Sequence, residues 1–343
     1  MKSNLLCEPT IGYAIIGCGR IAPNHLIAAR ENGFNVLWCC DLDLDKAIDF
    51  AIRNEIPYYT DKYESLIVNP MIDCVSICTD HRSHTDIAAH CISKKHMIIE
   101  KPLSSNLNLA IKFCHQIKSS TKATMVVAQH RYDDIVLFVK SLLHKKTLGR
   151  ITMVNAELSC YRNKLYYTQS YWRGKKELEG GSTVINQAYH VVDLLVFLFG
   201  LPNEVKSYCE NYVFADITNT EDSCVSLLKY DGFLCTFSST NTATKSWATR
   251  IKIVGTKGEI EFNIDFPPKI ISCNLNTEDY TETIRSLNSL YNNKLQQKVN
   301  YYGLSHIKQF ENFKNSILEK EQTDVTPEVA LSTLKLINMI YNN

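Results

Sequence analysis

The sequence of 343 residues has no strong excess of charge, because 37 basic residues stand against 36 acidic ones and leave a formal net charge of +1. A strong positive field is what draws nucleic acid or anionic membranes without a specific site, so we expect neither partner. The longest apolar run, VVDLLVFLFGL, contains Asp193 and is too short for the roughly 30 Å of bilayer hydrocarbon. The first residues, MKSNLLCEPT, lack the order of a secretion signal. The sequence therefore predicts a cytoplasmic protein.

Cysteine is abundant but lacks the spacing of a metal site. The 13 cysteines are scattered along the chain, and they include no CxxC pair and no Cys/His cluster at zinc spacing. Many fall in apolar stretches, as Cys39, Cys74, Cys78 and Cys91 do, and free cysteine is among the most buried residue types. We expect reduced cysteines that pack in the core, and no metal.

From residue 11 to about 130, short apolar runs alternate with segments of helical periodicity. YAIIGCG is followed by IAPNHLIAAREN, NVLWCCD by LDKAIDFAIRN, and DCVSICT by HTDIAAHCISK. Apolar strands that are each followed by a helix indicate βαβ units and a parallel sheet with helices on both faces. We therefore predict an α/β protein whose first domain, residues 1–127, is a doubly wound parallel sheet.

After Gly149 the runs become longer and partly alternating, as in RITMVNAELSC, CVSLLKYDGFLCTFSST and TRIKIVGTKGEIEFN. Two of these runs bend at DG and TKG, which are turn sequences typical of hairpins. This pattern predicts a second α/β domain, residues 128–343, with a large, mostly antiparallel sheet that is open on one face and covered by helices on the other. The last helical segment, PEVALSTLKLINMIYNN, is expected to pack back on the first domain.

The stretch GCGRIA, residues 17–22, matches the pattern G-x-G-x-x-A between an apolar strand and a helix. Gly17 allows the tight turn, Gly19 lets the backbone approach a pyrophosphate, and Ala22 lets the helix pack closely on the strand. The phosphates would lie at the N-terminus of that helix, beside Arg20 and Ile21. Because glycine-rich turns are common, this motif alone is weak evidence of a dinucleotide site.

Asp41 strengthens the prediction, because it ends the next strand about 20 residues after the glycines, where an acidic side chain can bind the hydroxyls of the adenosine ribose. A helix N-cap or turn is the structural alternative for this residue. The residues that follow, LDLD, offer no Arg or Lys for a 2′-phosphate. We therefore expect NAD rather than NADP.

The stretch HMIIEKPLSS, residues 96–105, is typical of a buried strand that stops abruptly at Glu100, Lys101 and Pro102. Ligands of open α/β sheets bind outside the carboxyl ends of the strands, so Glu100 and Lys101 are predicted at the rim of the cofactor site. Pro102 cannot continue the ladder of hydrogen bonds. An ammonium at this position can stabilise a developing alkoxide. The structural alternative is a surface lysine paired with Glu100.

The EKP sequence after SICTDHRSH, together with the first glycine motif, resembles the superfamily of glucose-fructose oxidoreductase, inositol dehydrogenase and MocA-like proteins. The resemblance implies that Lys101 is catalytic in the oxidation of a sugar or polyol. It also implies further residues at the cofactor: Thr79, His84, Glu100 and Gln129. The usual TPNxxH of the family departs here at Asp80 and His81, which replace Pro and Asn.

A third motif lies in WRGKKELEGGSTVINQAYHVVDLLVFLFG, residues 172–200. On a helix, Asn186, His190 and Asp193 would share one face, and Gly180 and Gly181 allow a close approach of the preceding loop. A lone helical histidine is more often structural than catalytic. The family carries a similar helix, and the resemblance implies that His190 is the acid or base for the substrate hydroxyl. The ordinary pKa of histidine, about 6.5, suits this role at neutral pH.

The identity of residue 186 bears on the substrate. Polyol dehydrogenases of the family have an aspartate in place of Asn186, and an amide cannot relay a proton. The asparagine form resembles members that act on sugar nucleotides, such as UDP-N-acetylglucosaminuronate 3-dehydrogenases. The substrate-binding residues predicted on this basis are Arg131, Trp172, Arg173, Asn186 and Asp193. Arg131 and Arg173 are expected either to bind a carboxylate or phosphate of the substrate or to form ion pairs within the protein.

The sequence as a whole predicts an NAD-dependent oxidoreductase that acts on a CH–OH group of a sugar, with a nucleotide-linked sugar oxidised at C3 as the preferred substrate. The resemblance implies a homodimer or homotetramer. Three alternatives stay open: an inositol or free-sugar dehydrogenase, a non-catalytic NAD-binding regulator, and an NAD-dependent glycosidase.

Overall fold

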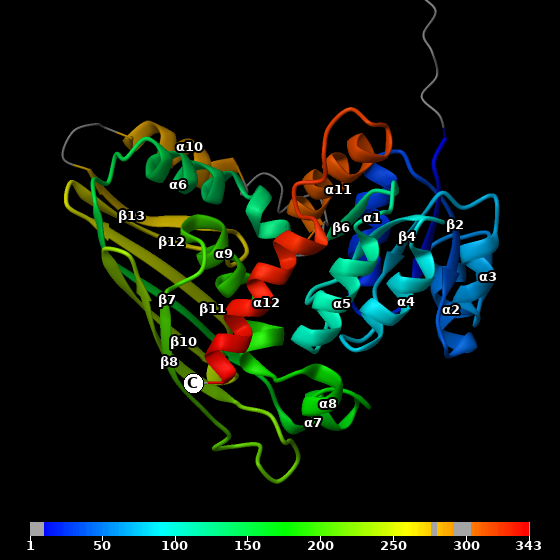
Figure 1. The fold of residues 1–343 in the computed structure, drawn as a ribbon, viewed down its shortest axis with the longest axis horizontal. Coiled ribbons are helices and arrows are strands. Elements are labelled where there is room, and N and C mark those ends of the chain that lie inside the picture. Colours follow the sequence, from blue (N-terminus) through cyan, green and yellow to red (C-terminus); the bar gives the residue numbers. More distant parts are fainter. Residues whose placement is uncertain (1–9, 276–279, 291–302, 343) are drawn as a thin grey trace, which may run out of the picture.

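The computed structural model describes residues 10–275, 280–290 and 303–342, which form two β-sheets with helices between and around them (Figure 1). The first sheet has six parallel strands in the order β3-β2-β1-β4-β5-β6. Its strands are β1 Gly12–Ile16, β2 Asn35–Cys40, β3 Tyr58–Thr60, β4 Cys74–Ile77, β5 His96–Ile99 and β6 Thr124–Val126. Its helices are α1 Ala22–Glu31, α2 Leu44–Arg53, α3 Tyr63–Val68, α4 Ser83–Cys91 and α5 Leu107–Ile117. This strand order is that of the Rossmann fold, which confirms the predicted parallel sheet.

The apolar character of the central strand explains why helices cover both faces of this sheet. In β1, Tyr13 and Ile15 belong to one buried cluster, whereas Ala14 and Ile16 belong to another. Successive side chains of a strand point to opposite faces, so a strand without polar positions needs a core on each side. Cys39, Cys74, Cys78 and Cys91 are buried, which confirms their predicted packing role.

The second sheet has seven strands in the order β13-β12-β11-β7-β10-β9-β8. Its strands are β7 Ile151–Tyr161, β8 Glu204–Glu210, β9 Ser223–Tyr230, β10 Phe233–Thr240, β11 Thr242–Gly255, β12 Gly258–Asn263 and β13 Lys269–Leu275. The predicted hairpins are confirmed at residues 231–232, between β9 and β10, and at residues 256–257, between β11 and β12. One pair, β7 with β10, is parallel, because the chain returns to β10 only after a long connection that contains helices and two further strands.

Alternation along β9 shows that one face of this sheet is covered and the other is open. Cys224, Leu228 and Tyr230 are buried, whereas Val225 and Leu227 are more than half exposed. Helices lie on the covered face, between the two sheets (Figure 1). The helices that follow the first sheet are η1 Gln129–Tyr132, α6 Asp134–His144, α7 Lys164–Thr168, α8 Lys176–Glu179, η2 Thr183–Gln187, α9 Tyr189–Phe199, α10 Thr281–Leu290, α11 Gly303–Ile317 and α12 Pro327–Tyr341.

The last two helices connect the two halves of the molecule. Helix α11 packs against α1, and its Phe310 and Phe313 contact the ring of Phe34 in the first cluster. Helix α12 contacts both α5 and α9 and runs between the sheets (Figure 1). Thr326 caps α12 by accepting a hydrogen bond from the backbone N–H of Val329.

Among the described residues, no single helix is long and apolar enough to cross a membrane. The bent pair Lys176–Gln187 and Tyr189–Phe199 meets the criteria of length and composition together, with 67° between its two parts. Residues 189–195 of that pair are buried inside the protein.

Candidate active site

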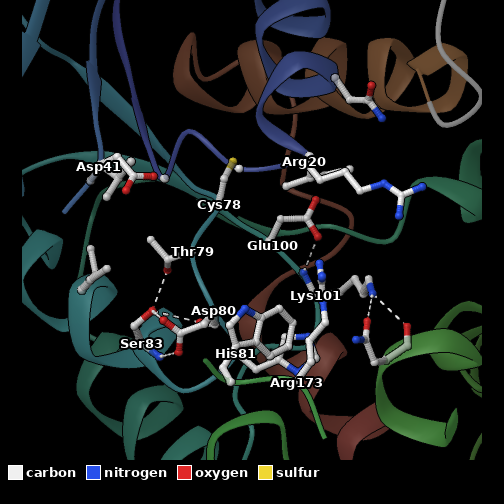
Figure 2. A pocket seen from close by; sticks show the side chains of 18 of the residues that line it. Arg20, Asp41, Cys78, Thr79, Asp80, His81, Ser83, Glu100, Lys101 and Arg173 are labelled. Atoms are coloured by element: carbon white, nitrogen blue, oxygen red, sulfur yellow. Dashed lines mark hydrogen bonds between the residues drawn. The ribbon is translucent and has the colours of Figure 1, made fainter. Parts of the chain in front are cut away.

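A cavity of about 990 Å³ lies outside the carboxyl ends of β1, β2, β4 and β5, and residues 162–190 of the second half form its other wall. Figure 2 shows 18 of the side chains that line it. The sequence-predicted residues in its lining are Gly17, Gly19, Arg20, Ile21, Asp41, Thr79, Glu100, Lys101, Gln129, Trp172, Arg173, Asn186 and His190. The predicted residues that the structure places outside the lining are His84, Arg131 and Asp193.

The glycine turn after β1 has the geometry that a dinucleotide site needs. Gly17 has φ +97°, and a Cβ there would lie 2.6 Å from the backbone oxygen of Cys78, so no side chain fits. A Cβ on Gly19 would meet no atom within 4 Å, which leaves the backbone open to a ligand. Helix α1 begins just beyond, without a side-chain cap. The positive end of this helix can therefore bind a phosphate.

Asp41 follows β2 and lines the same end of the cavity. Its carboxylate accepts hydrogen bonds from the backbone N–H of Cys18 at 2.9 Å and of Asp43 at 3.0 Å. Two acceptor positions of the carboxylate remain, enough for two ribose hydroxyls. Arg20 and Lys46 also line the cavity, and the Lys46 ammonium lies 3.2 Å from Asp43. The residues present thus fit an NAD molecule.

Lys101 emerges at the end of β5 and reaches across the cavity to the second half of the chain (Figure 2). Its Nζ donates to the backbone oxygen of Asn186 at 3.0 Å and to the Asn186 Oδ1 at 3.3 Å. Burial lowers the pKa of Lys101 below its ordinary value, whereas the charges of Glu100 and Glu179 oppose this change. The ammonium is therefore held at the cavity wall by an amide group and not by a carboxylate.

Glu100, the neighbour of Lys101, belongs to a buried cluster that the sequence analysis did not anticipate. The Glu100 Oε1 lies 2.9 Å from the His25 Nε2 and 3.9 Å from the His306 Nε2. Burial raises the pKa of Glu100, but its interactions with the two histidines outweigh burial and hold that pKa well below its usual range. The three ligand atoms could also surround a cation, yet the 2.9 Å contact is an ordinary hydrogen-bond distance. The only feature of the sequence that could have indicated this cluster is the position of His25, on the helix directly after the glycine turn.

His190 lies on α9 and is buried at the cavity wall. The Gln129 Nε2 is 3.2 Å from its Nε2, and the His130 ring packs edge-on against it with centroids 4.9 Å apart. Burial, together with electrostatic interactions with His130 and Lys101, lowers the pKa of His190 well below its ordinary value. The imidazole is therefore neutral near pH 7 and can accept a proton.

The prediction that Asn186, His190 and Asp193 share one continuous helix is wrong. Asn186 belongs to the π-helical turn η2, the chain breaks at Ala188, and α9 begins at Tyr189. The start of η2 is also held by contacts that sequence periodicity does not encode. The buried Glu221 carboxylate accepts hydrogen bonds from the backbone N–H groups of Ser182 and Val184.

Arg131 and Asp193, which we expected at the substrate, are instead paired with each other. Arg131 Nε and Nη2 donate to the two carboxylate oxygens at 2.8 and 2.7 Å, and Thr333 adds a third hydrogen bond at 2.7 Å. Burial lowers the pKa of Arg131, and the Asp193 carboxylate more than offsets it, so the charge persists. In the structure Arg131 therefore forms an ion pair within the protein, which was the alternative expectation. The pair lies outside the cavity lining and holds α9 through Asp193.

His84 also lies behind the cavity wall. Its Nδ1 is 2.7 Å from the backbone oxygen of Pro102, and its Nε2 is 3.2 Å from that of Thr79. Both carbonyls follow strands whose ends form the cavity. In this structure His84 fixes two cofactor-side loops relative to each other.

Two guanidinium groups mark the end of the cavity away from the glycine turn. Arg162 and Arg173 both line it, and both lie over the ring of Tyr166, at 5.0 and 4.4 Å from its centroid. Only Arg173 was predicted. Arg162, Tyr166 and Trp247 come from parts of the chain that carry no motif, so nothing in the sequence pointed to them.

The two departures from the family pattern after β4 both contact the second half of the chain. The hydroxyl of Tyr171 donates to the Asp80 Oδ2 at 2.6 Å. The His81 Nδ1 is 2.8 Å from the backbone oxygen of Glu179, and the His81 ring packs against Trp172. Asp80 and His81 therefore tie the cofactor side of the cavity to segment 171–179.

Comparison with known families agrees with this geometry. Residues 11–128 match the model of an oxidoreductase family with an NAD-binding Rossmann fold. Residues 136–261 match the model of the GFO/IDH/MocA C-terminal domain. The two models together span most of both sheets.

Individual proteins show more distant likeness. An oxidoreductase of Formosa agariphila is 29% identical over 204 residues, which are 58% of this chain and 64% of that protein, so the match spans less than two thirds of its length. Trans-1,2-dihydrobenzene-1,2-diol dehydrogenase of Xenopus tropicalis is 26% identical over 266 residues, 76% of this chain and 78% of that protein. The crystal structure of the WlbA dehydrogenase from Bordetella pertussis, in complex with NADH and UDP-GlcNAcA, has a TM-score of 0.88 at 22% identity and covers 98% of this chain and 96% of that one.

Proposed function

The chain belongs to the GFO/IDH/MocA family of oxidoreductases, whose Rossmann domain binds NAD, and on that basis we propose that it oxidises or reduces a nucleotide-linked sugar. The reaction interconverts a secondary alcohol and a ketone at one ring carbon, with C3 as the proposed position. The observation that carries the proposal is the contact of Lys101 with Asn186, an amide, in a cavity that His190 also lines. In support, the similar WlbA structure holds a nucleotide sugar.

Each protein group has a defined part in the oxidation. NAD, when bound, supplies the acceptor for the hydride. The neutral imidazole of His190 accepts the proton of the substrate hydroxyl as a general base. The ammonium of Lys101 donates to the developing alkoxide and stabilises its charge. In the reduction of a ketosugar, protonated His190 donates the proton as a general acid and the ammonium of Lys101 again stabilises the developing alkoxide.

The cations at the substrate end favour a substrate with an anionic group. Within the described residues, the Nε atoms of Arg162 and Arg173 are buried without a hydrogen-bond partner. A buried donor without a partner costs free energy, and a carboxylate or phosphate satisfies a guanidinium best. A uronic acid or a nucleoside diphosphate supplies such a group, whereas inositol and neutral free sugars do not.

The proposal is tested by the formation of NADH from NAD with a panel of nucleotide sugars, sugar phosphates, uronic acids, free sugars and inositols. We expect turnover with a nucleotide sugar, and loss of about two or more powers of ten in kcat for Lys101→Met. Lys94→Met, at an exposed lysine of the same half, is the matched control and should keep full turnover.

Three outcomes would contradict the proposal. Turnover of inositol or a neutral sugar alone would assign another substrate class. Cleavage of an aryl glycoside without net NADH would indicate a glycosidase. Tight binding of NAD with no turnover of any alcohol, and no reduction of any ketosugar, would favour a regulator.

A further inference from the structure

A buried carboxylate lies directly behind Asn186, on the side away from Lys101. Glu179, the last residue of α8, has no exposed surface. Its Oε1 accepts from the Asn186 Nδ2 at 2.6 Å, and its Oε2 accepts from the backbone N–H of Gly174 at 2.5 Å. Lys101, Asn186 and Glu179 therefore form a continuous chain of hydrogen bonds.

When Glu179 is ionised, the chemistry of these groups allows one orientation of the Asn186 amide. An ionised carboxylate only accepts hydrogen bonds and an ammonium only donates them. The NH₂ of Asn186 must consequently face Glu179, which turns its oxygen toward Lys101. The other neighbour of the amide, the hydroxyl of Tyr166 at 3.3 Å, can donate or accept, so it does not select an orientation.

We propose that Glu179 is a positioning residue, which acts on Lys101 through the Asn186 amide. Glu179 is also the reason why residue 186 is an asparagine and not an aspartate. The inference rests on the proposed function, because it concerns the ammonium that acts on the substrate. An aspartate at 186 would place two carboxylates within hydrogen-bond distance, and like charges that share a site cannot both stay ionised.

Glu179 itself is fixed from both halves of the chain. Its backbone oxygen is 2.8 Å from the His81 Nδ1, which comes from the loop after β4. Gly180, which follows it, has φ +89°, and a Cβ there would lie 2.4 Å from the backbone oxygen of Ser105. Burial raises the pKa of Glu179 to about 7, so its ionised form depends on the two hydrogen bonds that it accepts. Figure 2 shows His81 beside Lys101 in the cavity wall.

The geometry makes a specific exchange of side chains possible. In Glu179→Gln, the new amide cannot accept from both Gly174 and Asn186, so either the loop is strained or the Asn186 amide turns its NH₂ toward Lys101. In Asn186→Asp, two carboxylates face each other. In the double variant, the introduced glutamine would accept from Gly174 and donate to the introduced aspartate, which keeps an oxygen for Lys101. Every donor and acceptor in the chain is then satisfied again.

The test is a double-mutant cycle of Glu179→Gln and Asn186→Asp, measured as kcat and KM for a substrate of the panel. We expect each single variant to lose about tenfold or more in kcat with little change in the KM for NAD, and the double variant to recover to within about threefold of the parent protein. Glu177→Gln, two residues earlier on α8 and exposed, is the matched control. Losses that multiply in the double variant would overturn the inference, as would full activity of Glu179→Gln.

A second readout does not depend on the substrate. The pH dependence of acetylation of Lys101 by acetic anhydride, followed by mass spectrometry in the NAD-bound protein, reports the proton affinity of its ammonium. We expect the midpoint to move to higher pH in the double variant, because a carboxylate then faces Lys101. An unchanged midpoint would overturn the inference. A shifted midpoint in a protein that turns over no alcohol would support the inference and count against the proposed function.

Discussion

The buried pair of Arg131 and Asp193 distinguishes a structural role from the substrate-binding role that the sequence suggested. Their side chains are 8% and 2% exposed, and Asp193 accepts three hydrogen bonds. Removal of one partner from a buried pair costs about 3–5 kcal/mol, because the other charge stays buried and unpaired. Asp193→Asn should therefore lower Tm by roughly 5–15 °C. Replacement of both residues, as Arg131→Met with Asp193→Leu, should recover most of that loss.

Thermal unfolding followed by circular dichroism measures this effect, and Asp216→Asn is the control. Asp216 pairs with Lys164 at 2.6 Å, but both side chains are more than half exposed, so its loss should leave Tm unchanged within about 1 °C. A second measurement is the KM of Asp193→Asn for the substrate, which we expect to stay within about threefold of the parent value. A normal Tm combined with a KM that rises at least about tenfold would refute the structural role and return the pair to the substrate.

Three further predictions concern the cofactor end and the stability of the site. Gly17→Ala should abolish NAD binding in a fluorescence titration, because its φ of +97° and the nearby backbone oxygen of Cys78 leave no room for a Cβ; binding within about threefold of the parent would contradict this. Asp41→Asn should lower the preference for NAD over NADP in kcat/KM by about tenfold or more, and an unchanged ratio would remove Asp41 from ribose recognition. Glu179 has a pKa raised from 4.5 to about 7. As pH rises, the unfolded chain therefore loses this proton at a lower pH than the folded protein, and the stability of the folded protein falls between these two values. The Tm of Glu179→Gln should lack that decline, and identical pH profiles would show that Glu179 does not titrate there.

Much of the fold was predictable because its signals are local. The alternation of apolar runs with helical periodicity predicted the parallel sheet, and GCGRIA predicted the turn in which Gly17 has a left-handed φ. The carboxyl ends of parallel strands meet at one edge, so Asp41 and Lys101 could be placed at the same cavity although β2 and β5 lie far apart in the sequence. The DG and TKG hairpins were predictable for the same local reason.

The rest depended on partners that are remote in the sequence. The N-terminal end of η2 is held by the carboxylate of Glu221, which accepts from the backbone N–H of Ser182, and no periodicity within residues 182–199 records this contact. The ion pair of Arg131 with Asp193 also involves Thr333, which lies 140 positions after Asp193 in the chain. Arg162 and Tyr166 lie in segments without a motif, and only the packing of the second half brings them to the cavity.

The sequence by itself determined the layers of the fold, the position of the cofactor turn, and the two groups, Lys101 and His190, that we propose as catalytic. Tertiary structure alone decided what surrounds these groups: which charges are paired, which carboxylate lies behind Asn186, and which guanidinium Nε atoms lack a partner within the described residues. The physical reason is that periodicity and turn chemistry act between near neighbours, whereas hydrogen bonding and desolvation depend on distances that only the folded chain sets.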